Sequence, residues 1–405
     1  MVWAGGSLMV IRQDYTFWRI IHNLVLDKEY RVLQISPNQQ EVWLESSEKH
    51  LPNIIRILRH DLDWGNWMQH DMERTLNNVE NVGRKLGRKN IDAVNIYVST
   101  YPSVDNWRFR LEKPLSKKGH RTKTVLQTFL LHADTPDAQD IDKLTEMLKI
   151  KDILDIDTPL FDSSKLELLK QEVLVATQKR IKLEQRIFQN GKPFFTYFFI
   201  TLQLLMFFLL EISGGSTNVS TLIKFGAKEN SLIIAGEWWR FFTPIILHIG
   251  FFHLVMNTLA LYFLGSAVER IFGRTRFLVV YLLAGFSGSL ASFIFSPVIS
   301  AGASGAIFGC FGALLYFGFV HPKLFFRTMG SNVIAIILLN LAFGFIVPGI
   351  DNAGHIGGLI GGFLASSIIA LPNNKAVLSR IIGLVVTIIL IVALLNMGYN
   401  MQPNP

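Results

Sequence analysis

Four polar residues near the starts of apolar segments have the types and spacing to carry chemistry. Ser304 stands in the small-residue run Gly-Ala-Ser-Gly, residues 302–305, at the head of an apolar segment. His355 lies near the start of a second apolar segment. His253 and Asn257 lie on a third and are four residues apart, so they share one face of a helix. Polar side chains are costly in hydrocarbon, and inside apolar segments they usually mark function.

These residue types suit the hydrolysis of a peptide bond inside a membrane. A serine hydroxyl is a weak nucleophile until a base removes its proton, and His355 is the plausible base. Attack on the carbonyl creates an oxyanion, for which His253, Asn257 and the backbone N–H groups of the serine and of Gly302 are the candidate donors. The nearest carboxylate, Asp351, lies one turn before His355, so the pattern favours a Ser-His dyad over a triad.

The elements that must position these residues are predicted to be membrane helices. Most charged residues lie before Pro193, and the chain beyond it is dominated by apolar runs. Seven of these runs are near the length of about 20 residues that crosses a bilayer. They cover residues 194–212, 250–268, 277–296, 303–320, 333–348, 354–371 and 381–398.

The charges between the runs predict the membrane topology of the chain. A stretch rich in Lys and Arg, residues 178–192, precedes the first run, and basic residues recur after the second, fourth and sixth, as at Arg270, Lys323 and Arg380. Basic flanks stay in the cytoplasm, so the N-terminus is predicted to be cytoplasmic and the C-terminus outside. Residues 1–10 lack the pattern of a signal peptide, so the first run is expected to direct insertion.

This topology makes the second, fourth and sixth runs parallel and places their polar residues at one depth, near the outer face. Taken singly, Ser304 could be a packing serine and Asn257 an interhelical hydrogen-bond donor. His248 and His253 could each be an interfacial anchor or a metal ligand. Their shared depth on three parallel helices favours catalysis.

Glycines on two of these helices could bring the dyad together. Gly305 and Gly309 are four residues apart on one helix, and residues 357–358 and 361–362 repeat that spacing on another. Faces of small residues let membrane helices approach closely. The same glycines fit general helix packing, and the two interpretations are compatible.

The first part of the chain is predicted to be a soluble α+β domain with one sheet covered by helices. The predicted strands are residues 31–35, 41–45, 91–99 and 124–132, and the predicted helices are residues 15–27, 51–58, 64–88, 137–150 and 163–188. The expected division is a domain at 1–175, a basic linker helix at 176–193, a catalytic core at 194–371, and a seventh span with a short tail at 372–405.

One cluster in this domain could bind a metal ion. His60, Asp61, Asp63 and Asp71 combine imidazole and carboxylates, which suit Mn²⁺ or Zn²⁺. The alternative is a solvated, charge-rich helix start that Asp61 and Asp63 cap, and this is favoured. The basic stretch 83–89 is interpreted as a solvated helix end that faces the inner leaflet.

The net charge of +8 does not call for a nucleic-acid partner, because basic residues that flank membrane helices explain much of it. The chain has one cysteine, Cys310, which excludes an intramolecular disulfide.

At its polar residues the sequence strongly resembles the rhomboid family of intramembrane serine proteases. The resemblance covers roughly residues 194–371 and rests on the segments 302–305 and 353–358, on His248, His253 and Asn257, and on the pair Trp239 and Arg240. It implies a six-helix core, here with a seventh helix, and a short serine-bearing helix below a water-filled cavity. It also implies cleavage of transmembrane substrates near their outer end, without a cofactor, with Trp239 and Arg240 in a supporting outer loop.

The N-terminal region is similar to the cytosolic domain of GluP-type bacterial rhomboids, on the segments 14–18 and 60–63. That resemblance implies a bacterial cell membrane protein with a metal-sensing domain and, in some members, an adaptor role with a membrane AAA protease. It also implies an extracytoplasmic tetratricopeptide-repeat domain, whereas this sequence stops at Pro405, shortly after the last predicted span.

Two other classes of function compete with proteolysis. An adaptor that presents membrane clients to a partner protease would need neither Ser304 nor His355. A transporter or channel would place polar residues near the bilayer centre, whereas these are predicted near the outer face.

Overall fold

The computed structural model of this chain describes residues 2–46, 48, 50–62, 65–85, 88–101, 107–119, 122–132, 137–150, 163–372 and 377–401. The chain divides into two compact units, Met1–Leu183 and Glu184–Pro405. Each unit has its own hydrophobic core.

The first unit is an α+β domain around a mixed sheet. Its helices are α1 (Val2–His22), the π-helical turn η1 (Asn23–Asp27), α2 (Gly65–Lys85), the 3₁₀ turn η2 (Arg108–Arg110), α3 (Ala138–Leu148) and most of α4 (Ser163–Ile187). The strands are β1 (Arg31–Ile35), β2 (Glu41–Glu45), β3 (Ile54–Arg59), β4 (Asn90–Ser99), β5 (Leu115–Lys118) and β6 (Lys123–His132). Among the described residues the order is β1-β2-β3-β4-β6-β5, in which β3, β4 and β6 are parallel and the other pairs antiparallel.

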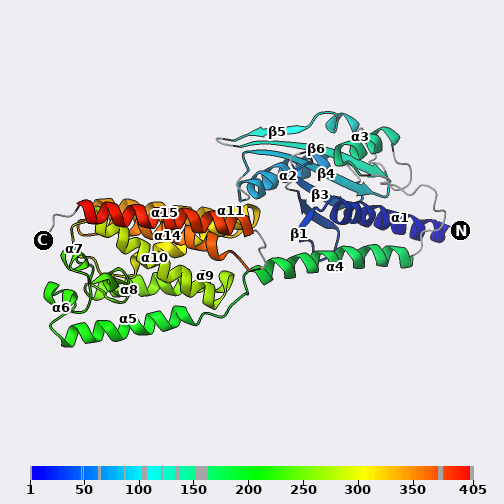
Figure 1. The fold of residues 1–405 in the computed structure, drawn as a ribbon. Coiled ribbons are helices and arrows are strands. Elements are labelled where there is room, and N and C mark those ends of the chain that lie inside the picture. Colours follow the sequence, from blue (N-terminus) through cyan, green and yellow to red (C-terminus); the bar gives the residue numbers. More distant parts are fainter. Residues whose placement is uncertain are drawn as a thin grey trace. The chain divides into compact units, whose positions relative to one another are not determined.

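Helices cover both faces of this sheet (Figure 1). On one face, side chains of α1, α3 and α4 such as Phe17, Leu144 and Val173 join the apolar residues of the strands. On the other face, α2 packs through Val79 against Ile91 of β4. The predicted sheet covered by helices is therefore confirmed.

One predicted element of this unit is wrong. Residues 51–58 were expected to be helical, but Ile54–Arg59 form the strand β3. The four residues 54–57 are all buried, as in a strand that is covered on both faces, so no alternation of apolar and polar residues marks it. A short and mostly apolar run of this kind, here interrupted by Arg56, is equally compatible with one or two turns of buried helix.

The second unit is helical among its described residues. The long helices are α5 (Phe195–Ile212), α8 (Phe251–Ala260), which continues through the π-helical turn η5 (Leu261–Gly265) into α9 (Ser266–Phe272), α10 (Arg274–Phe295), α11 (Ser304–Val320), α13 (Gly330–Ile346), α14 (Asn352–Ile369) and α15 (Val377–Met401). The short ones are α6 (Val219–Lys224), α7 (Asn230–Ile234), η3 (Trp238–Phe241), η4 (Thr243–Ile246) and α12 (Pro322–Thr328).

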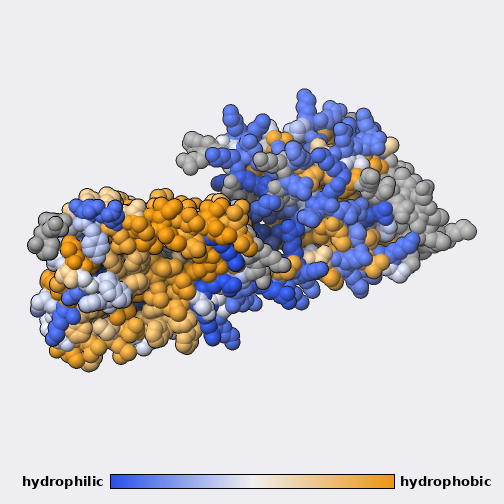
Figure 2. Space-filling view, in the orientation of Figure 1, coloured by the Kyte–Doolittle hydropathy of each residue, from blue (hydrophilic) through white to orange (hydrophobic). Residues whose placement is uncertain are grey.

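All seven predicted spans are apolar helices. Five of the described helices are long and apolar enough to cross a membrane, and the bent pair α12–α13 (72°) can form a sixth. The helix of Ser304, α11, is shorter, with 17 residues. The face of this unit that Figure 2 shows is largely apolar, as expected for a multi-pass membrane protein.

Three helices, α10, α11 and α14, pack closely through glycines. A Cβ atom on Gly358 of α14 would lie 2.0 Å from the carbonyl oxygen of Gly305 on α11. A Cβ atom on Gly362 would lie 2.1 Å from the carbonyl oxygen of Gly309, one turn further along. The close approach that the small-residue spacing predicted is therefore confirmed, and it joins the helix of Ser304 to the helix of His355.

A buried carboxylate fixes the start of α5. Glu269 of α9 is fully buried and accepts hydrogen bonds from the backbone N–H groups of Phe194 (2.8 Å), Phe195 (2.9 Å) and Thr196 (2.9 Å). The first N–H groups of a helix have no partner within the helix and favour negative charge. Glu269 supplies both the hydrogen-bond acceptor and the negative charge, so it links the start of α5 to α9.

Candidate active site

The structure places the predicted catalytic residues at three helix starts. Ser304 is the first residue of α11, His253 the third of α8 and His355 the fourth of α14. Both α8 and α14 contact α11. All three side chains are half-buried.

His253 lies against the backbone beside Ser304. A Cβ atom on Gly302 would lie 2.7 Å from Cε1 of His253 and 3.8 Å from Oγ of Ser304. Gly302 also has a φ of +150°, which side chains disfavour. Only glycine permits this approach, and it brings the imidazole of His253 to the position next to the serine hydroxyl.

His355 is held against the helix of Ser304 by an aromatic contact. Its imidazole stacks on the ring of Phe308, with ring centroids 4.3 Å apart and planes 10° apart. Phe308 follows Ser304 by four residues on α11, so the ring of His355 is fixed one helical turn from the serine.

The nearest acid caps a helix. Asp351 accepts a hydrogen bond from the backbone N–H of Gly354 at 2.9 Å and so caps α14. Nδ1 of His355 is buried, and no described residue is its hydrogen-bond partner. This arrangement fits a dyad better than a triad.

Two of the predicted oxyanion donors have other partners. The backbone N–H of Gly302 donates to the carbonyl of Pro244 at 2.9 Å. The side-chain amide of Asn257 donates to the carbonyl of His253 in its own helix, also at 2.9 Å. The role predicted for Gly302 stays a prediction, and the sequence could not show that the segment around Pro244 lies beside it. The donors left beside the hydroxyl are the imidazole of His253 and the backbone N–H of Ser304.

The segment that contains these residues matches a known family. Residues 235–372 match the family model of the Rhomboid domain. Over 388 residues the chain is 46% identical to the rhomboid protease GluP of Bacillus subtilis (strain 168), which covers 96% of this chain and 75% of that protein. The chain belongs to the rhomboid family. It is a serine endopeptidase of the GluP type, with a helical membrane core and an N-terminal α+β domain.

Shorter matches link this rhomboid to other members. The putative rhomboid protease YdcA of Bacillus subtilis (strain 168) is 38% identical over 133 residues, which are 32% of this chain and 67% of that protein. RHOMBOID-like protein 1 of Arabidopsis thaliana is 43% identical over 148 residues, which are 36% of this chain and 38% of that protein.

His248 supports the ring of His253 in this rhomboid. It is fully buried and packs edge to face against His253, with ring centroids 5.4 Å apart. This contact limits where the imidazole of His253 can lie.

Arg240 holds the loop between α5 and α8 together. Its buried guanidinium binds the carboxylate of Glu237 (2.6 Å) and the carbonyls of Ile223 (2.9 Å) and Ala227 (2.8 Å). Trp239 beside it is 44% exposed and packs edge to face on Trp238. Of the predicted supporting pair, Arg240 is thus a buried residue that links parts of the loop, and Trp239 is an aromatic residue at the surface.

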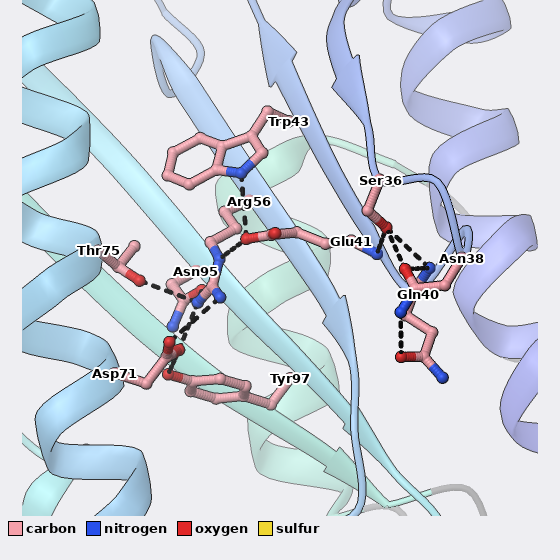
Figure 3. A network of polar contacts seen from close by, with 10 residues as sticks. All are labelled: Ser36, Asn38, Gln40, Glu41, Trp43, Arg56, Asp71, Thr75, Asn95 and Tyr97. Atoms are coloured by element: carbon pink, nitrogen blue, oxygen red, sulfur yellow. Dashed lines mark hydrogen bonds and ion pairs between the residues drawn. The ribbon is translucent and has the colours of Figure 1, made fainter.

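Asp71 of the predicted metal cluster belongs to a network around Arg56 (Figure 3). Its carboxylate accepts hydrogen bonds from Arg56 (2.5 Å) and from the hydroxyl of Tyr97 (2.7 Å). Arg56 is buried and also binds Glu41 at 2.5 Å. The guanidinium of Arg56, flanked by two carboxylates, thus gives Asp71 a structural partner.

The other members of that cluster are also placed by protein contacts where the structure describes them. Asp61 accepts hydrogen bonds from the side chain of Gln13 (3.0 Å) and from the backbone N–H of Thr100 (2.6 Å). The ring of His60 lies on Trp67, with centroids 4.5 Å apart. Asp63 lies outside the described residues. Within the part that the structure describes, no group of three or more His, Cys, Asp or Glu side chains could hold a metal ion.

Proposed function

We propose that this rhomboid cleaves peptide bonds inside the membrane with a dyad of Ser304 and His355. Oγ of Ser304 attacks the carbonyl carbon of the scissile bond while His355 accepts the hydroxyl proton. The C–N bond then breaks and His355 gives that proton to the leaving amine. Water, deprotonated in turn by His355, hydrolyses the acyl ester and restores the serine. The observation that carries the proposal is the stacking of His355 on Phe308, one turn from Ser304.

The oxyanion formed in each step needs preorganised donors. His253 is suited to this because its imidazole lies over Gly302, beside the serine hydroxyl. The backbone N–H of Ser304, at the start of α11, adds a second donor. Asn257 adds a third once its amide turns from the carbonyl of His253.

The substrates in this proposal are transmembrane proteins that are cut near the outer face of a bacterial plasma membrane. Basic residues after α9 and α11, such as Arg274 and Arg327, favour a cytoplasmic N-terminus and an extracellular C-terminus. Labelling of single cysteines with an impermeant maleimide in intact cells tests this. Reaction at residue 327 but not at residue 215 would contradict the orientation.

Proteolysis of a tagged single-span reporter in liposomes tests the dyad. Ser304→Ala and His355→Ala are expected to abolish cleavage, by at least about 10³-fold, because the nucleophile or its base is gone. Ser366→Ala and His321→Ala are matched controls, since they remove the same residue types at the far ends of α14 and α11. Both controls are expected to cleave the reporter.

Two outcomes would change the proposal. Cleavage by Ser304→Ala at the wild-type rate would exclude this serine as the nucleophile. If the wild type neither cleaves the reporter nor reacts with a fluorophosphonate, the adaptor that presents clients to a partner, such as a membrane AAA protease, becomes the better function.

Binding of Mn²⁺ or Zn²⁺ by the N-terminal domain is a separate hypothesis that rests on the sequence of the His60, Asp61, Asp63 and Asp71 cluster. Calorimetric titration of the full chain with each ion tests it. Heat that is unchanged in Asp61→Asn and Asp63→Asn would exclude these ligands.

A further inference from the structure

Lys228 is a fully buried lysine in the loop between α5 and α8. Its ammonium donates hydrogen bonds to two backbone carbonyls, those of Ser296 (2.7 Å) and Val298 (3.0 Å). A buried lysine is rare, and its charge is costly unless fixed partners replace water. Such a residue calls for an explanation beyond packing.

The two carbonyls belong to the segment that leads to the nucleophile. Ser296 ends α10, and residues 297–303 connect it to Ser304 at the start of α11. The carbonyls at a helix end have no partner within the helix and favour positive charge. The ammonium of Lys228 therefore places a positive charge beside the carbonyls at the end of α10, where such a charge is favourable.

The backbone of Lys228 holds the same segment a second time. Its N–H donates to the carbonyl of Ser300 at 2.9 Å, and the N–H of Ser300 donates back at 3.1 Å. Two residues further, the N–H of Gly302 donates to the carbonyl of Pro244 at 2.9 Å. The segment is thus fixed along its length, up to two residues before Ser304.

Lys228 is itself firmly held. The carbonyl of the preceding residue, Ala227, accepts a hydrogen bond from the buried Arg240 at 2.8 Å. Nearby, the side chain of Asn230 donates to the carbonyl of Phe293 in the last turn of α10 at 3.0 Å. The loop and the end of α10 are therefore joined on both sides of Lys228.

We propose that Lys228 is a positioning residue for catalysis, whose buried ammonium holds residues 296–302 in the conformation that presents Ser304 beside His253. This inference rests on the proposed proteolytic function and adds a loop residue to it. Displacements of about 1 Å at a reacting atom can lower a rate by about 10²-fold, so loss of the ammonium should slow the chemical step.

The charge of Lys228 makes this role depend on pH. Burial lowers its pKa from the usual 10.5 to about 8, although Glu229 in its own loop and Asp351 at the start of α14 favour the charged form. Charged donors make hydrogen bonds about twice as strong as neutral ones, so the hold on residues 296–302 weakens as the pH rises through about 8.

Stability changes in the opposite direction. Because the pKa of Lys228 is lower in the folded chain, the unfolded chain binds more protons between about pH 8 and 10.5. The free energy of unfolding therefore rises with pH over that window. If Lys228 had only a structural role, turnover would not fall over the pH range in which the folded chain becomes more stable.

Rates of fluorophosphonate labelling and of reporter cleavage, on the full chain in liposomes, test the proposal. Lys228→Met keeps a long side chain without the donor and should lower the labelling rate and kcat by about tenfold or more, with KM unchanged. Lys224→Met is the matched control, an exposed lysine in the same loop, and should react like the wild type. Lys228→Arg keeps a charge at all accessible pH values and should restore activity in part.

The pH profile provides a measurement that does not depend on how well Lys228→Met folds. Wild-type labelling should fall above about pH 8, and the profile of Lys228→Arg should stay flat there. Equal labelling rates in wild type and Lys228→Met, a change in KM alone, or the same profile in wild type and Lys228→Arg would each overturn the inference. Labelling of the wild type but not of Ser304→Ala separates these outcomes from a failure of the proposed protease function.

Discussion

Gly302 shows how strongly a single residue can be constrained beside a nucleophile. Its N–H donates to the carbonyl of Pro244, and its α-carbon faces the ring of His253. Its φ of +150° lies in a region that glycine adopts far more readily than other residues. Gly302, two residues before Ser304, therefore serves the geometry of the site.

Replacing this glycine should damage catalysis more than folding. In Gly302→Ala the new Cβ atom would press on Cε1 of His253 at 2.7 Å, so the imidazole must move from its place beside Ser304. We expect the rate of fluorophosphonate labelling to fall by about 10²-fold. The control Gly236→Ala also has a positive φ, +105°, but nothing lies within 4 Å of its Cβ position. If both variants lose labelling equally, backbone strain and not the contact with His253 is the cause.

At the scale of helices, the glycines of α11 and α14 are not equivalent. A Cβ atom on Gly358 would meet the carbonyl oxygen of Gly305 at 2.0 Å, whereas a Cβ atom on Gly305 would find its nearest neighbour, the carbonyl oxygen of Gly354, at 3.5 Å. A methyl group therefore does not fit at Gly358, whereas it does fit at Gly305.

This asymmetry predicts different stabilities for two similar variants. Gly358→Ala should lower the free energy of unfolding by about 3 kcal/mol or more, since rigid backbones must separate. Gly305→Ala should change it by less than about 1 kcal/mol, because its Cβ atom fits at an ordinary contact distance. Thermal unfolding in detergent measures both. Equal loss of stability in the two variants would mean that the helices adjust freely at this contact.

Among the helices and strands, the sequence predicted the membrane spans but not every strand or loop contact. The sequence identified the seven apolar runs, and with them the polar residues near the starts of three of them, because a run of about 20 apolar residues usually indicates a membrane-spanning helix. The strand β3 was mistaken for a helix, since residues 54–57 are all buried and show no alternation. The two bonds of Lys228 to α10 and the bond from Gly302 to Pro244 depend on how distant loops meet, which spacing along the chain does not encode.

At the scale of the molecule, the chain has two separate hydrophobic cores, one in each unit. The core of the membrane unit consists mainly of apolar residues and closely packed helix glycines, and its buried charged side chains, such as Glu269 and Lys228, bind backbone groups. The first unit has a core of its own and a buried ionic network around Arg56. Units with cores of their own can in principle respond separately to mutation. Damage to one core therefore need not spread to the other.

Arg56→Ala tests this separation. It leaves the carboxylates of Glu41 and Asp71 without the guanidinium between them, which should cost the first unit about 3 kcal/mol. Arg74→Ala removes an exposed arginine from α2 and should cost less than about 0.5 kcal/mol. Hydrogen exchange of the full chain, read by mass spectrometry, should show faster exchange in β2, β3 and α2 of Arg56→Ala and unchanged exchange in α10, α11 and α14. Faster exchange in both units would instead show that the two cores unfold together, so that the N-terminal domain could control the protease through its stability.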